Sequence, residues 1–281
     1  MDSSPRSSSA AASPSCASSG APLSVSSALP SESSSSSSST YMTRTTPLSS
    51  SLSARRTPAK SVQSVIPISP ETRAVLLRKT GKEYLTSADL PDELDLSYCD
   101  ELVDVSALGS VKVLNLRDCP QLVNVSALGG VHRLNLSSCR GITDVSMLGA
   151  LTRLDLTRCV RVSDVSALGG VHHLLLRFLP ALTDVSALGA VHTLSLTGCT
   201  GLVDVSPLGG VHDLNLSLCV GVEDVSSLGT VHTLNLSGCT GVVDVSALGT
   251  VHSLVLRGCT HVADVSALGK VAELIVPEHL D

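Results

Sequence analysis

Three kinds of side chain that can do chemistry recur along this sequence every 20 residues, and cysteine is the first. Eight of the nine cysteines share one position of the spacing, namely Cys99, Cys119, Cys139, Cys159, Cys199, Cys219, Cys239 and Cys259. Zinc-binding cysteines usually come in pairs a few residues apart, and no such pair is present. Equivalent side chains of stacked repeats point in parallel, which disfavours disulfide bonds. The column therefore predicts a structural ladder of buried free thiols, typical of a reducing compartment.

Aspartate forms the second column, with Asn124 replacing it in one copy. Its members are Asp104, Asp144, Asp164, Asp184, Asp204, Asp224, Asp244 and Asp264. One carboxylate per repeat supplies too few oxygen ligands for calcium. We expect these side chains to cap a short helical turn by accepting hydrogen bonds from its first free backbone N–H groups.

Histidine forms the third column, at the second position of six copies: His132, His172, His192, His212, His232 and His252. Imidazoles stacked about 5 Å apart are able to bind a transition metal or to respond to pH. Half-exposed rings that were copied with the repeat are the simpler interpretation. We therefore predict no metal site and no cofactor.

These residues do not predict catalysis. Ser, His and Asp recur in columns, whereas a catalytic triad needs one nucleophile held by one base. The phosphate-binding, hydrolase and metalloprotease motifs G-x-x-x-x-G-K-[ST], G-x-S-x-G and H-E-x-x-H are absent from the sequence. We expect a protein that is not an enzyme.

The repeat unit shows how these columns are positioned. The copy at 231–250 reads VHTLNLSGCTGVVDVSALGT. Its first six residues alternate apolar and polar, which predicts a short strand with one buried face. The Val and Leu of D-V-S-A-L-G are three apart, so one tight helical turn buries both, and the Gly after them is expected to end the turn with a positive φ. A single coil cannot bury its own apolar residues, so stacked copies with a parallel sheet are expected.

The pattern L-x-x-L-x-L-x-x-C-x-x-L, met at Val231, Leu234, Leu236, Cys239 and Val242, resembles leucine-rich repeats. The D-V-S-x-L half resembles the short convex turn of internalin-type repeats. This resemblance implies an α/β-type solenoid, a horseshoe with a parallel β-sheet on its concave face and short 3-10 or helical turns on its convex face. The family binds many unrelated partners through the concave sheet, so the resemblance does not name a partner.

Three segments are expected along the chain. Residues 1–64 are a Ser-rich, low-complexity stretch and are predicted to form a disordered tail. A targeting peptide for an organelle and a phosphorylated regulatory tail are the alternatives for this stretch. Residues 65–90 are predicted to be an N-terminal capping segment with a helix at about 70–80. Residues 91–281 are predicted to form nine repeats of 20 residues and a partial C-terminal strand.

Charge and hydropathy disfavour nucleic acid as a partner and predict no membrane span. Residues 1–64 carry five Lys and Arg against two acidic residues, net +3, and the remainder carries 14 against 23, net −9. The negative repeats and the 1% of aromatic residues disfavour nucleic-acid binding. No run of about 18 apolar residues predicts a membrane span, and no apolar segment after Met1 predicts a secretory signal.

The copy at 171–190 departs from the others. The third, fifth, seventh and eighth positions are expected to face the concave side, and they are mostly small and polar elsewhere. Here they are larger, and arginines of the two preceding copies lie at equivalent or neighbouring positions. The candidate partner-binding residues are Arg133, Arg153, Arg158, His173, Leu175, Arg177 and Phe178. Arginine and aromatic residues favour interface centres, so we expect an acidic and partly apolar protein partner. The alternative is a decayed copy in which Phe178 fills the space left where Leu179 replaces the cysteine.

The function expected from the sequence is a non-enzymatic protein-interaction module that binds through the concave sheet. We expect a monomer in the cytoplasm or another reducing compartment. Three alternatives stay open: a regulatory or substrate-recruiting subunit of an enzyme complex such as a ubiquitin ligase, a surface adhesion protein, and a repeat protein with no dedicated partner.

Overall fold

The computed structural model describes residues 65–280, so the predicted tail at 1–64 lies outside the described residues. Helix α1 (Pro70–Thr80) comes first, and ten three-residue strands follow. The strands are β1 (Glu93–Asp95), β2 (Val113–Asn115), β3 (Arg133–Asn135), β4 (Arg153–Asp155), β5 (His173–Leu175), β6 (Thr193–Ser195), β7 (Asp213–Asn215), β8 (Thr233–Asn235), β9 (Ser253–Val255) and β10 (Glu273–Ile275). The 3-10 turns are η1 (Ser87–Asp89), η2 (Ser106–Ser110), η3 (Ser126–Gly130), η4 (Ser146–Leu148), η5 (Ser166–Gly170), η6 (Ser186–Leu188), η7 (Ser206–Gly210), η8 (Ser226–Thr230), η9 (Ser246–Leu248) and η10 (Ser266–Leu268).

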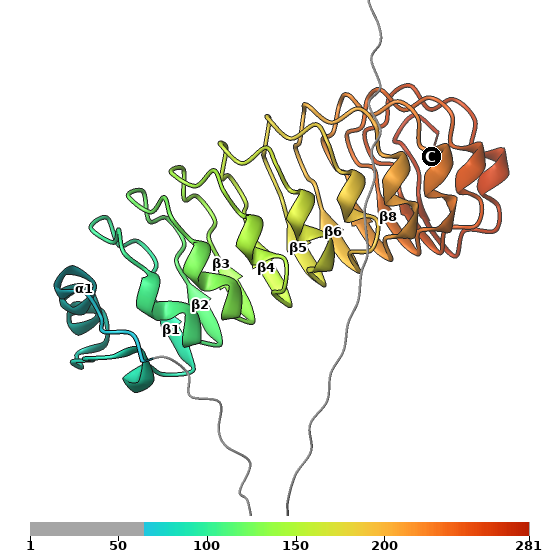
Figure 1. Cartoon of the computed structure of the whole chain (residues 1–281). Helices are drawn as coiled ribbons and strands as arrows, with labels where there is room; N and C mark the ends of the chain where they lie inside the picture. Colours follow the sequence, from blue (N-terminus) through green and yellow to red (C-terminus); the bar gives the residue numbers. More distant parts are fainter. Residues whose placement is uncertain (1–64, 281) are drawn as a thin grey trace, which may run out of the picture. The chain divides into compact units, whose positions relative to one another are not determined.

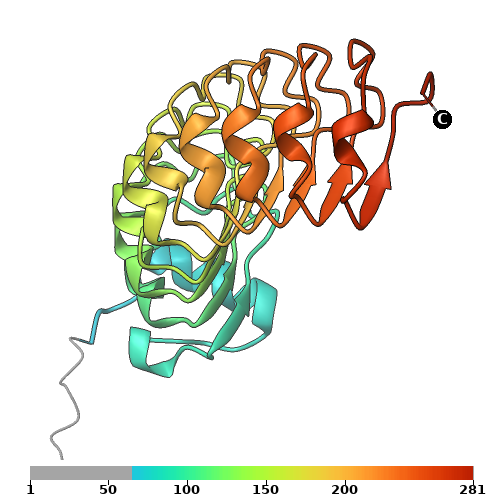
Figure 2. The same ribbon diagram turned by 90° about the vertical axis from the view of Figure 1, so that its right-hand side faces the viewer.

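The strands form one parallel sheet in the order β1 to β10, so each strand pairs with the strands before and after it in sequence (Figure 1). The register matches equivalent residues, for example Leu234 with Leu254. Strands and 3-10 turns form two separate rows along the stacked coils (Figure 2). This architecture is a leucine-rich repeat solenoid, which confirms the fold predicted from the sequence.

The core consists of the same seven positions in each coil from residue 111 to residue 250. In the coil that begins at β8 they are Val231, Leu234, Leu236, Cys239, Val242, Val245 and Leu248, all essentially inaccessible to solvent. Each buried Leu or Val stabilises the fold by about 1.5–3 kcal/mol relative to an exposed side chain. The Val–Leu spacing of D-V-S-A-L-G gives the expected 3-10 turn, because Leu248 donates its N–H to the Val245 carbonyl at 3.0 Å.

The expectation that the glycine after this turn adopts a positive φ is wrong. Gly249 has a φ of −63°, which any residue adopts. Glycine is required there because the next coil comes close: a Cβ on Gly249 would lie 2.5 Å from the carbonyl oxygen of Ala267. The positive φ falls instead at the eighth position, where the chain leaves the strand. Glycine takes it at Gly198 (71°), and non-glycine residues such as Phe178 (57°) take it in other coils.

Helix α1 covers the first coil. Ser69 is its N-cap and accepts a hydrogen bond from the Thr72 N–H, and Gly81 ends it in the left-handed conformation. The Thr72 hydroxyl donates to the carbonyl of Asp104 at 2.6 Å, and Leu76 is buried in the common core. The helix thus supplies the apolar surface that a preceding coil would otherwise provide.

The far end of the described chain is covered less completely. Val265, Val271 and Leu274 of the last coil are only partly buried, whereas their equivalents in the preceding coils are buried. Within residues 65–280, no helix has the length and apolar character needed to cross a membrane.

The glycine contact predicts a position-dependent effect on stability. Gly249→Ala should lower the free energy of unfolding by about 1–3 kcal/mol, because the new methyl group must displace the Ala267 carbonyl. Gly269→Ala is the matched control, since Gly269 has nearly the same φ of −61° and no heavy atom within 4 Å of the new Cβ. Urea unfolding of both variants measures the difference. Equal destabilisation would contradict the proposed role of the coil-to-coil contact.

Candidate functional site

Strands β3, β4 and β5 place three basic or titratable residues side by side. Arg133 pairs in register with Arg153, and Arg153 pairs with His173. Both arginines are exposed, and neighbouring strands lie about 4.8 Å apart. The solvent-facing row of the sheet is therefore positively charged here. Burial, followed by the neighbouring His172 and Arg153, lowers the pKa of His173, so the neutral imidazole is favoured beside the arginines.

The fifth position supplies an apolar residue to the same face. Leu175 is half-buried and lies in register between Asp155 and Ser195. The Asp155 carboxylate accepts a hydrogen bond from the N–H of Thr157 at 2.9 Å, within its own coil. Leu175 is a large aliphatic side chain on the sheet face, whereas its in-register neighbours Asp155 and Ser195 are polar.

Arg158, Arg177 and Phe178 lie just beyond the strands. The Arg158 guanidinium carbon lies 5.4 Å from the centre of the Phe178 ring, a cation–π arrangement. The ring rests on the next coil, where a Cβ at Gly198 would come within 2.6 Å of it. The Arg177 side chain is also held to the next coil, because its Nε donates a hydrogen bond to the Ser195 hydroxyl at 2.9 Å.

Phe178 does not fill the space of the missing cysteine. Leu179 occupies that place with no exposed surface, while Phe178 remains 38% exposed. The particular repacking expected of a decayed copy is therefore not what the structure shows. The structure brings Arg133, Arg153 and His173 together in one row on the sheet face, with Leu175 on the same face. Arg158, Phe178 and Arg177 form a separate group beyond the strands.

The ladder cysteines are free and buried in the described chain. Each thiol from Cys119 onward donates to a leucine carbonyl of the preceding coil; Cys239, for example, contacts the Leu216 oxygen at 3.0 Å. The equivalent bonds are made by Cys119, Cys139, Cys159, Cys199, Cys219 and Cys259. Burial raises the pKa of Cys199 to about 11 and that of Cys239 to about 12. The thiols of Cys199 and Cys239 are consequently held in the protonated form, which donates the hydrogen bond to the preceding coil.

The aspartates act one residue earlier than an N-cap. A valine such as Val145 occupies the N-cap position, and Asp144 before it accepts a hydrogen bond from the N–H of Ser146 at 2.9 Å. Hydrogen bonds from the backbone and hydroxyl of Ser146 lower the pKa of Asp144. The side chains of the column that make this bond to the serine two residues ahead are Asp104, Asp144, Asp164, Asp184, Asp204, Asp224, Asp244 and Asp264.

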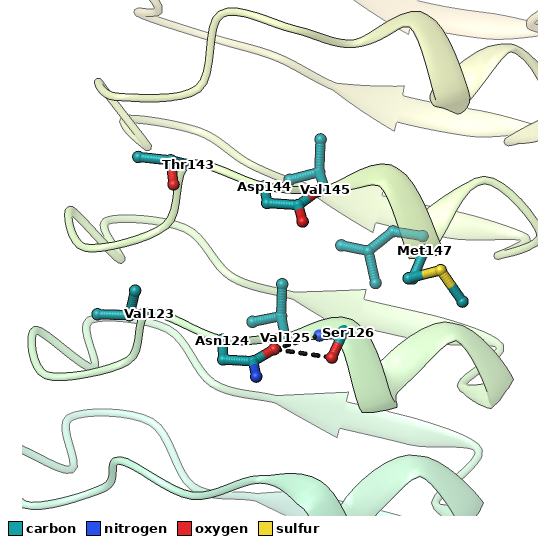
Figure 3. A pocket seen from close by; sticks show the side chains of 9 residues that line it. Val123, Asn124, Val125, Ser126, Thr143, Asp144, Val145 and Met147 are labelled. Atoms are coloured by element: carbon teal, nitrogen blue, oxygen red, sulfur yellow. Dashed lines mark hydrogen bonds between the residues drawn. The ribbon is translucent and has the colours of Figure 1, made fainter.

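Shallow hollows separate successive turns on this side of the coils. Figure 3 shows one of them, with Asn124 accepting hydrogen bonds from both the N–H and the hydroxyl of Ser126 and with Met147 at its rim. Equivalent hollows recur at other coils, for example around Asp184 and around Asp244. They follow from the stacking of turns, so they do not single out one ligand site.

Five histidine rings of the column stack beside the N-terminal ends of strands β5 to β9. Consecutive ring centres are 4.6–4.7 Å apart from His172 to His252. His132 lies outside the stack, because Thr152 takes the intervening position. Asp213 is not among the residues predicted from the sequence, and its carboxylate lies beside two of these rings. The available signal was a carboxylate directly after a histidine of the column.

No family model and no curated protein sequence matches this chain. Among solved structures, internalin C2 of Listeria monocytogenes is 21% identical over 78% of this chain and 99% of its own, with a TM-score of 0.46. The functional domain of InlJ from Listeria monocytogenes, described as including a cysteine ladder, is 15% identical over 72% of this chain and 62% of its own, with a TM-score of 0.33. The leucine-rich repeat domain of the type III effector XopL is 15% identical over 66% and 76%, with a TM-score of 0.48. The fold of this chain is established by its own sheet register and repeated core.

Buried thiols of raised pKa should resist alkylation. At pH 8 a pKa near 11 leaves roughly 200-fold less thiolate than the ordinary value of about 8.5, and burial slows access further. Iodoacetamide should therefore label Cys199 and Cys239 at least about 100-fold more slowly in the native protein than in urea. Peptide-resolved mass spectrometry measures each rate, and rapid native labelling would contradict a buried ladder.

The lowered pKa of the turn aspartates predicts acid sensitivity. A carboxyl whose pKa is lower in the folded state contributes stability above its unfolded pKa of about 3.9 and loses it as the pH falls further. Asparagine keeps the hydrogen bond, as Asn124 does, but does not titrate. The variant with Asp184, Asp204 and Asp224 changed to Asn should lose less free energy of unfolding than the parent between pH 5 and pH 3. Urea unfolding at both pH values measures this, and an equal loss would contradict the assignment.

Proposed function

We propose that this chain is a non-enzymatic protein-interaction module that binds an acidic, partly apolar segment of a protein partner across β3–β5. The supporting observation is the register pairing of Arg133 with Arg153 on the exposed face, next to a half-exposed Leu175. The Arg158–Phe178 pair lies just beyond the strands of the same coils. We call these residues, together with His173 and Arg177, the β3–β5 patch.

The arginines of the patch have charge to offer a partner. The ion pairs within residues 65–280 involve Arg78, Lys112, Arg257 and two histidines, and none involves Arg133, Arg153 or Arg158. A partner carboxylate can therefore form a charge-assisted hydrogen bond with a guanidinium without breaking an existing ion pair. Because the repeats are net negative, the patch also differs in sign from its surroundings and would direct an acidic segment to it.

Leu175 and Phe178 supply the apolar part of the proposed contact. Phe178 lies close both to the Arg158 guanidinium and to the backbone at Gly198. A side chain that is already ordered loses little conformational entropy on binding, so more of its buried area contributes to affinity. Arginine and aromatic side chains of this kind commonly dominate binding energy.

The remaining alternatives differ in what the partner is. A substrate-recruiting or regulatory subunit of an enzyme complex would use the same patch, and the captured partner would identify the complex. Adhesion would require a partner on a cell surface. The free, buried thiols support a reducing compartment, and we propose a monomer as the working state.

The proposal predicts that Arg153→Glu combined with Phe178→Ala abolishes partner capture. The change reverses one charge and removes the ordered ring, so affinity should fall by about tenfold or more. Affinity capture from extract of the native cells, quantified by mass spectrometry, compares the parent with this double variant.

The matched control is Arg257→Glu combined with Leu218→Ala. Arg257 is an exposed arginine of the coil that begins at β9, and Leu218 is an exposed apolar residue at the same eighth position as Phe178. A protein kept by the parent and the control but lost by the patch variant supports the proposal. A partner retained by all three, or lost equally from both variants, would overturn it.

A further inference from the structure

One carboxylate lies among the stacked histidines, at the N-terminal ends of the strands. Six repeats carry histidine at the second position, and the residues that follow are Arg133, His173, Thr193, Asp213, Thr233 and Ser253. Asp213 is thus the acidic residue of that set. It belongs to β7 and is half-buried beside the rings.

Asp213 lies beside the nitrogens of two stacked rings. His212 Nδ1 lies 3.1 Å from one Asp213 carboxylate oxygen, and His192 Nδ1 lies 3.9 Å from the other. The ligand atoms of the three residues all lie within 4.8 Å of one another. The two rings are nearly parallel, with their centres 4.7 Å apart and an interplanar angle of 14°.

The backbone that carries these side chains is fixed by the sheet. The N–H groups of His212 and Asp213 both donate to the carbonyl of His192, at 3.2 Å and 2.9 Å. The Thr193 hydroxyl lies 3.3 Å from His192 Nδ1 and 3.4 Å from the Asp213 carboxylate. The site therefore draws on two adjacent coils whose relative position the strand pairing determines.

We propose that His192, His212 and Asp213 bind a divalent late transition metal ion, with Zn²⁺ as the representative ion. Two imidazole nitrogens and one carboxylate oxygen are a donor set that suits Zn²⁺, Ni²⁺ or Cu²⁺, whereas Mg²⁺ and Ca²⁺ prefer oxygen ligands throughout. Three protein ligands leave a fourth position for water or for a side chain of a partner.

To share one ion, the two parallel rings have to tilt toward each other, because a metal lies in the plane of the imidazole that binds it. Zinc bonds of about 2.0–2.2 Å bring tetrahedral ligand atoms to about 3.4 Å from one another. The side chains of His192, His212 and Asp213 are 45%, 49% and 37% exposed, so they can rotate into place without displacing the core. The Thr193 hydroxyl gives up its contact with His192 Nδ1 when that nitrogen binds the ion, and it remains a hydrogen-bond donor to the Asp213 carboxylate.

Metal binding has two physical consequences at this site. The ion replaces a proton wherever the nitrogen it takes was protonated, so binding weakens as the pH falls. The ion also joins two coils, so it stabilises the folded state by an amount that grows with the logarithm of its concentration above Kd. Neither consequence depends on the β3–β5 patch, so this proposal stands apart from the proposed function.

The test uses the untagged full chain and Zn²⁺ itself. Asp213→Thr gives the third position the residue that both neighbouring coils already have, Thr193 and Thr233, so the variant is expected to fold. Isothermal titration calorimetry should show a site in the parent that this variant binds about tenfold more weakly or not at all. Zn²⁺ should also raise the Tm of the parent and leave that of Asp213→Thr much less affected.

His252→Ala is the matched control, because His252 ends the same stack and has Ser253 in place of a carboxylate. It should keep the affinity and the Tm shift of the parent. His212→Ala should lose both. The proposal is overturned if Asp213→Thr binds Zn²⁺ as the parent does, or if His252→Ala weakens binding as much as Asp213→Thr. Circular dichroism and the Tm without metal confirm that each variant is folded.

Discussion

In-register stacking of equivalent coils is the constraint on which the rest of this structure depends. Strand pairing matches each residue with the residue 20 positions along, so every buried side chain packs against its own equivalents. The thiol of one coil bonds the carbonyl of the coil before it, and a glycine admits the carbonyl of the coil after it. Because all these contacts repeat, a residue that changes the coil spacing at one place would disturb several columns together.

The same constraint turns sequence columns into surfaces. Two arginines that are far apart in the chain become neighbours on the sheet, and so do two histidines. The β3–β5 patch and the edge at His192, His212 and Asp213 are both places where a column changes residue type. In a regular solenoid such departures are the positions at which one coil can be recognised differently from the others.

Much of the fold follows from the sequence, since it rests on local pattern. Alternation predicts the strands, and the spacing of Val245 and Leu248 predicts the 3-10 turn. The role of Gly249 was not predictable from its own repeat, because the close atom belongs to the next coil. The eighth position gave no clear signal either, since six non-glycine residues adopt its positive φ. The environment of Asp213 was missed for a related reason, because one of the two ring nitrogens beside it belongs to a different repeat.

The contact between Phe178 and Gly198 has a consequence for how such repeats can diverge. The aromatic ring lies where a side chain at position 198 would be, and Leu218 lies in the same way over Gly238. In these two places the bulky residue and the glycine of the next copy fit each other, whereas Tyr98 is followed by Asp118 and Arg158 by Phe178. At these two places a side chain added at the glycine would have to displace its neighbour, so the two copies are not free to change independently there.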